Sequence, residues 1–127
     1  MYNKKERAKD LRLRREYGIT LEEYNKILKF QDYKCAICKQ LASKFKTSLA
    51  LDHSHLSGLL RGLCCVACNR ALGRFRDNDE LVNNAASYVN NPPITAVFGY
   101  PRFTVPGRIG TKVRAKKLKK LQLERNI

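Results

Sequence analysis

The sequence predicts a small α+β fold in which a β-hairpin and a short helix form the centre and longer helices flank it. The 127 residues, 43% hydrophobic and 29% charged, are enough for a modest core in a globular domain. Apolar residues recur at helical spacing on either side of a central segment that holds two short apolar runs. Two Cys-x-x-Cys pairs enclose that segment, and the C-terminal end is strongly basic.

Two helices are expected before the first cysteine. Residues 4–16 consist largely of helix-forming residues and stop short of Gly18, a residue type that commonly ends helices. The sequence Thr-Leu-Glu-Glu at 20–23 has the capping-box pattern, in which the threonine and the second glutamate each satisfy a free backbone N–H group. Apolar residues at helical spacing follow, so a second helix is predicted over residues 21–31.

The centre of the chain predicts a turn and loop, then a hairpin, then a short helix. Residues 33–48 lack helical periodicity and form the expected loop. The apolar runs at 48–52 and 59–63 are separated by serines and a glycine, a pattern typical of two strands joined by a turn. The short helix is expected over residues 69–75.

One more helix is expected to start at the acidic capping sequence of residues 77–80 and to end at the Asn-Asn-Pro-Pro sequence of residues 90–93. Prolines and glycines recur over residues 94–110, which predicts a linker or an extended arm. We therefore divide the chain into a domain of residues 1–93 and a linker with a basic tail of residues 94–127.

Positive charge dominates the chain, because it contains 26 Lys and Arg but only 11 Asp and Glu, which gives a net charge of +15. The expected partner is a polyanion, either nucleic acid or an anionic membrane. Solubilising ends are the plain alternative, and the last segment lacks the aromatic anchor typical of membrane-binding helices. We favour contacts with DNA phosphates through six residues of the tail, namely Lys112, Arg114, Lys116, Lys117, Lys119 and Lys120.

Neither a signal peptide nor a transmembrane span is expected, because no run of about 18 apolar residues occurs in the sequence. We expect a cytoplasmic protein without a membrane partner, in the cytoplasm of the host if a phage encodes it. In that compartment the five cysteines are not expected to form a disulfide framework.

Four of the five cysteines predict a zinc site. Cys35 with Cys38, and Cys65 with Cys68, form two Cys-x-x-Cys pairs, and both sulfurs of such a pair can face one point. Two pairs complete a tetrahedral four-sulfur shell, which favours a structural Zn²⁺ and leaves no position for water. A redox-active pair is the alternative, but neither pair has the strand-to-helix context of one. Cys64 is left out of the shell and is expected to fill a core position.

Both histidines of the chain lie between the cysteine pairs, in the sequence Asp52-His53-Ser54-His55. On a strand, alternation places Asp52 with Ser54 on one face and His53 with His55 on the other. A hairpin held by zinc would present these polar residues with little core around them. Taken alone, however, an aspartate next to a histidine is usually an ordinary hydrogen-bonded pair.

The combined motif resembles phage recombination endonuclease VII and its relatives: Cys-x-x-Cys, then Asp-His-x-His, then Gly-x-x-Arg-Gly-Leu-x-Cys-x-x-Cys-Asn. The resemblance runs over residues 11–93 and is most specific over residues 35–73. It implies a zinc-stabilised ββα-metal (His-Me finger, HNH-like) core with flanking helices and a basic C-terminal arm. It also implies a DNA endonuclease that requires Mg²⁺ or Mn²⁺ and leaves 5′-phosphate and 3′-hydroxyl ends.

The resemblance further implies roles at the matching positions. Asp52 and Asn69 would bind the catalytic Mg²⁺ or Mn²⁺, and His53 would be the general base that activates water. His55 matches the family's second histidine, which leaves open a phosphate contact, orientation of the metal shell, or a backbone contact. Arg61 would contact phosphate, with a structural salt link as the alternative. Asn69 is also placed to cap a helix.

The substrate and the oligomeric state stay open. The last 35 residues do not resemble the longer helical C-terminal portion with which the family's junction resolvase forms an intertwined dimer, so a monomer and a homodimer both fit the sequence. Nicking of duplex DNA, homing-type cleavage and resolution of branched DNA such as a Holliday junction all fit the motif. The alternative function is a non-catalytic zinc module that binds DNA or protein. Such a module does not need Asp52, His53 and Asn69 together, and their presence favours catalysis.

Overall fold

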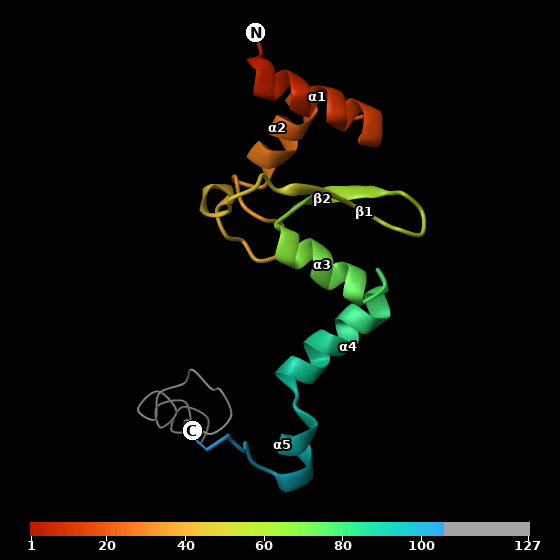
Figure 1. Ribbon diagram of the computed structural model, residues 1–127. Helices are drawn as coiled ribbons and strands as arrows, with labels where there is room; N and C mark the ends of the chain where they lie inside the picture. Colours follow the sequence, from red (N-terminus) through yellow and green to blue (C-terminus); the bar gives the residue numbers. More distant parts are fainter. Residues whose placement is uncertain (106–127) are drawn as a thin grey trace. The chain divides into compact units, whose positions relative to one another are not determined.

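The computed structural model describes residues 1–105 (Figure 1). These residues form five α-helices, one short 3₁₀ helix and one two-stranded sheet. The chain divides into two compact units, the first over Met1–Asn78 and the second starting at Asp79. The predicted DNA contacts of the tail lie outside the described residues, namely Lys112, Arg114, Lys116, Lys117, Lys119 and Lys120.

The two N-terminal helices, α1 (Lys4–Tyr17) and α2 (Leu21–Phe30), match their predictions closely. Gly18 ends α1 in the left-handed conformation, with φ of 67°. The predicted capping box opens α2, because the Thr20 side chain accepts from the N–H of Glu23 and the Glu23 side chain accepts from the N–H of Thr20. Asp10 joins the two helices, since its Oδ1 accepts from the N–H of Leu21 at 2.8 Å.

The expected hairpin is formed by β1 (Ala50–His53) and β2 (Leu60–Cys64), which pair antiparallel. The expected loop before it contains the 3₁₀ helix, Ala42–Lys44. The hairpin packs between the α1–α2 pair and the next helix (Figure 1). The buried core between the hairpin and these helices includes Leu13 of α1, Tyr24 of α2, Leu51 of β1 and Leu63 of β2.

The helix after the hairpin, α3 (Val66–Arg74), begins three residues before the predicted start at residue 69. The prediction was wrong here because it placed the second cysteine pair before the helix. Cys65 is itself the N-cap residue, and its sulfur accepts from the N–H of Cys68 at 3.5 Å. Asn69 therefore lies in the first turn of α3 and is not its cap, which removes the capping role considered for it.

The second unit contains α4 (Asp79–Asn90) and α5 (Pro93–Phe98). The α4 prediction is confirmed to within two residues, but the structure has a helix where an extended linker was expected. Pro93 is compatible with this helix because proline fits the first turn, where its missing N–H group has no partner to lose. Across residues 1–105, no helix is both long enough and apolar enough to cross a membrane.

Candidate functional site

The four predicted zinc ligands lie together. The Sγ atoms of Cys35, Cys38, Cys65 and Cys68 are all within 4.8 Å of one another, and those of Cys38 and Cys65 are 3.9 Å apart. Four sulfurs at the usual Zn–S distance of about 2.3 Å would be about 3.8 Å apart, so the spacing fits tetrahedral zinc. The first pair lies in the loop after α2, and the second at the start of α3. A metal held here would fasten α3 to that loop.

Two of the four thiols have opposite pKa shifts. Burial opposes ionisation of Cys35, but N–H groups of Cys65, Cys38 and Ile37 outweigh it and lower the pKa of this thiol to about 6. Burial, followed by the neighbouring sulfurs, raises the pKa of Cys68 to about 12. A cation held among the four sulfurs would favour their thiolate forms, which is the chemistry of a zinc site.

Cys64 is not part of this cluster. It is 3% exposed and belongs to the core, as predicted. Burial raises the pKa of its thiol to about 12. Cys64 is therefore a buried cysteine that directly precedes Cys65 in the sequence but is not one of the four clustered cysteines.

Asp52 and the two histidines differ in burial, but strand alternation does not separate Asp52 from His55, because β1 ends at His53 and both residues line the pocket described below. Asp52 is 4% exposed, whereas His53 is half-buried and His55 is exposed in the turn after β1. The rings of His53 and His55 stack with their centroids 5.1 Å apart. Tyr17, at the end of α1, approaches the His53 ring to 5.9 Å. The imidazole of His53 is thereby contacted by aromatic rings from two elements.

An irregularity of the hairpin positions Arg61. Asp52 pairs with Gly62 and His53 pairs with Leu60, so Arg61 is the extra residue of a β-bulge. Its Nε donates to Oδ2 of Asp52 at 2.7 Å, and its Nη2 donates to Oδ1 at 3.1 Å. One guanidinium therefore fixes the orientation of a nearly buried carboxylate. This is the structural salt link that the sequence left as the alternative to a phosphate contact.

Asp77 completes this ion-pair group, although sequence reasoning treated it as part of a helix cap. Its Oδ1 accepts from Nη2 of Arg61 at 2.9 Å, and its Oδ2 accepts from the N–H of His55 at 3.0 Å. Arg76 and Asp77 both have a positive φ, 56° and 53°, which turns the chain sharply after α3. Two features of the sequence could have suggested this contact. One is the cationic Arg61 in the hairpin, and the other is the Asp-Asn sequence of residues 77–78 just after α3.

A pocket of about 380 Å³ brings most of the predicted residues together. Its lining includes Asp52, His55, Asn69 and Asp77, and on α3 also Arg70 and Arg74. His53 does not line the pocket, but its ring stacks on the ring of His55, and His55 does line the pocket. The pocket therefore combines hard oxygen donors with cationic side chains, a set suited to a divalent cation and a phosphate group.

The Asp77 contact predicts a defined acid titration. Arg61, followed by the His55 N–H, holds the pKa of the Asp77 carboxyl below its ordinary value of 3.8. Because the folded-state pKa is the lower one, the contact stabilises the fold above that value and is lost as the pH falls through the lowered pKa. We expect the NMR signal of the His55 amide to shift with a midpoint below pH 3.8.

The Asp77→Ala variant should lose this acid-range step, and Asp79→Ala, an exposed change of equal charge on α4, should keep it. A midpoint at or above the ordinary value, or a step that persists without Asp77, would contradict the assigned contact.

Comparison with known proteins identifies one family. A sequence model described as recombination endonuclease VII matches residues 10–91. Two curated proteins, each named "Gene 59 protein", from Mycobacterium phage D29 and Mycobacterium phage L5, are each 42% identical to the chain over 91 residues. These alignments cover 71% of the chain, and 54% and 55% of the two relatives, so the chain spans about half the length of the proteins it matches. No solved structure matches.

Proposed function

The chain belongs to the recombination endonuclease VII family, and from this premise we propose that it is a His-Me finger endonuclease that hydrolyses DNA with the help of Mg²⁺ or Mn²⁺. One observation carries the proposal: Asp52, His55 and Asn69 line a single pocket beside His53. The order of β1, β2 and α3 is also that of a ββα core. We assign Zn²⁺ to the four-cysteine cluster as a structural ion, separate from the reacting centre.

Asp52 and Asn69 are the residues that we assign to the catalytic cation. A carboxylate and an amide oxygen, completed by water, are the donors that Mg²⁺ prefers. A carboxylate has about four lone-pair positions, so Asp52 can accept two bonds from Arg61 and still present electrons to the pocket. When bound, the cation supplies positive charge that offsets the negative charge on the phosphate and on the departing 3′ oxygen.

His53 is the group that we assign as the general base. Its imidazole accepts a proton from the water that attacks the phosphorus. The bond from phosphorus to the 3′ oxygen breaks, and the departing 3′ oxygen takes up a proton, so the cut leaves a 5′-phosphate and a 3′-hydroxyl end. The rings of Tyr17 and His55 both contact the imidazole, which favours one orientation toward that water. We assign His55 a positioning role, since its backbone is tied to Asp77 and its ring supports His53.

The cationic side chains divide into two roles. Arg61 makes its hydrogen bonds to Asp52, Asp77 and the carbonyl of His53, which supports a positioning role over the direct DNA contact predicted for it. Arg70 and Arg74 line the pocket from α3 and are available for phosphate. The tail residues, with a net charge of +7 over 107–127, supply further contacts with the backbone of duplex or branched DNA.

Cleavage of two end-labelled substrates tests the proposal and identifies the substrate. A four-way junction and a linear duplex of matched sequence are incubated with the zinc-loaded protein in Mg²⁺ and in a buffer that lacks Mg²⁺ and Mn²⁺. Paired cuts across the junction, with the duplex spared, indicate a resolvase that acts as a dimer. Nicks at defined duplex positions indicate a nicking enzyme that acts as a monomer. Binding without cleavage in Mg²⁺ or Mn²⁺ would contradict the proposal in favour of a non-catalytic zinc module.

A further inference from the structure

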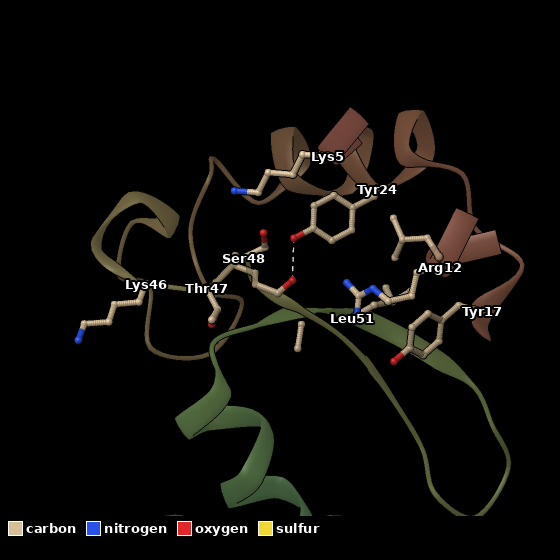
Figure 2. A pocket seen from close by; sticks show the side chains of 11 residues that line it. Lys5, Arg12, Tyr17, Tyr24, Lys46, Thr47, Ser48 and Leu51 are labelled. Carbon is tan, nitrogen blue, oxygen red and sulfur yellow. Dashed lines mark hydrogen bonds between the residues drawn. The ribbon is translucent and has the colours of Figure 1, made fainter. Parts of the chain in front are cut away.

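A second cavity lies between the N-terminal helices, α1 and α2, and the segment that leads into β1 (Figure 2). It has a volume of about 470 Å³. Lys5 and Arg12 project from α1, and Lys46 comes from the loop before β1. Lys9 is held at its edge, with Nζ 3.3 Å from Ser48 Oγ and 3.9 Å from the centre of the Tyr24 ring. We call the cavity and these four cations the basic groove.

The cations of the basic groove are not neutralised by the part of the chain that is described. Among residues 1–105, no carboxylate lies within 4.0 Å of the charged atoms of Lys5, Lys9, Arg12 or Lys46. The acidic residues of α1 are engaged elsewhere: Glu6 caps the helix at Asn3, Asp10 binds Arg14 and the start of α2, and Glu16 pairs with Arg15. The positive charge is therefore available to an external anion.

The spacing of these cations concentrates their charge on one helix face. Positions 5, 9 and 12 are four and three residues apart, so their side chains are neighbours on α1. Burial, and then Arg12 and Lys5, lower the pKa of Lys9, which reports the crowding of like charges. Like charges at this spacing oppose helix formation, so the arrangement does not serve folding. An anion bound in the basic groove would relieve that repulsion.

Tyr17 connects the basic groove to the candidate catalytic site. It lines the groove at the end of α1, and its ring also contacts His53. Leu51, which also lines the groove, directly precedes Asp52 on β1. From Lys5 to Tyr17, α1 rises about 18 Å, which corresponds to about five steps along one DNA strand.

We propose that the basic groove binds the phosphodiester backbone of DNA next to the scissile phosphate, with Lys5 and Arg12 as its principal contacts. This inference rests on the proposed endonuclease function of the neighbouring site. A row of cations along an open groove matches the repeated charges of a DNA strand better than it matches a single phosphate ion. The groove would thus set the direction in which the strand leaves His53.

Salt-dependent binding of a fluorescent duplex to the zinc-loaded protein, measured by anisotropy without added Mg²⁺ or Mn²⁺, tests the proposal. The Lys5→Gln/Arg12→Gln variant removes two charges and keeps good helix-forming residues. We expect the slope of log K against log salt to fall by about 1.8, and binding in 0.1 M salt to weaken by about 10- to 60-fold. The matched control, Lys26→Gln/Lys29→Gln, removes two charges from α2 outside the groove and should change the slope much less.

An unchanged slope in the groove variant, or equal losses in the two variants, would overturn the proposal. Loss of binding to anionic phosphatidylserine vesicles with unchanged DNA binding would overturn it in favour of a membrane surface. Since the proposed cleavage needs Mg²⁺ or Mn²⁺, omitting these ions lets binding be measured independently of catalysis while the zinc is kept. If the two variants change the slope as expected but the wild-type protein never cuts DNA in Mg²⁺, the proposed role of the basic groove stands and the proposed endonuclease function is excluded. Zinc content and circular dichroism verify that each variant is folded.

Discussion

The His53→Ala variant is expected to lose DNA cleavage by a factor of about 10²–10⁴ while it still binds DNA and zinc. The imidazole accepts the proton of the attacking water, and His55, which also lines the pocket, is assigned to position it. DNA affinity depends on cationic contacts and should be nearly unchanged, because the substitution removes no permanent charge. Single-turnover cleavage in Mg²⁺, together with anisotropy without added Mg²⁺ or Mn²⁺, measures the two effects separately.

His55→Ala is the comparison variant for this experiment. It removes the ring that stacks on His53 but leaves the backbone N–H that donates to Asp77. A smaller loss of rate than in His53→Ala is expected, because the base is present but less well oriented. Equal cleavage by wild type and His53→Ala would exclude His53 as the base. If His55→Ala loses cleavage completely while His53→Ala stays active, His55 is the general base and His53 the positioning residue.

The second large effect is expected at the cysteine cluster. Cys35→Ser should abolish stoichiometric zinc binding and the cooperative unfolding of the first unit. In small zinc domains the metal contributes about 10–16 kcal/mol of apparent free energy, more than the buried residues of a short hairpin supply. The expected observation is one zinc per chain in the wild type, a large decrease in the variant, and loss of the thermal transition in the variant.

Cys64→Ala is the matched control for the cluster. It removes a buried thiol directly beside Cys65 but takes no ligand from the metal. It should retain one zinc per chain and show a modest decrease in melting temperature, as expected for a small change in the core. Wild-type protein that is folded without metal, or a Cys64→Ala protein that loses its zinc, would contradict the assigned ligand set.

Features that depend on a few neighbouring residues could be predicted from the sequence. The capping box at Thr20, the C-terminal glycine of α1 and the spacing of the cysteines each act through atoms close along the chain. The hairpin was indicated by two apolar runs on either side of a turn. These elements therefore appear in the structure nearly where the sequence indicated them.

The ion-pair group could not be predicted, because it depends on a register irregularity and on a turn distant in sequence. Regular pairing would set Arg61 opposite His53, whereas the bulge directs its guanidinium to Asp52. Asp77 reaches the group through two successive residues with positive φ, a conformation that no local pattern specified. The early start of α3 has a similar origin, since a cysteine sulfur replaces the usual oxygen cap.

The central claim is that this site hydrolyses DNA in a metal-dependent reaction, and the most direct test is to reseal its products. Zinc-loaded wild-type protein cleaves an end-labelled substrate in Mg²⁺, EDTA stops the reaction, and the purified DNA is incubated with a DNA ligase that requires 5′-phosphate and 3′-hydroxyl ends. We predict cleavage in Mg²⁺, none when Mg²⁺ and Mn²⁺ are omitted from the zinc-loaded protein, and nicks that the ligase closes. DNA that stays intact, or nicks that cannot be resealed, would contradict the account.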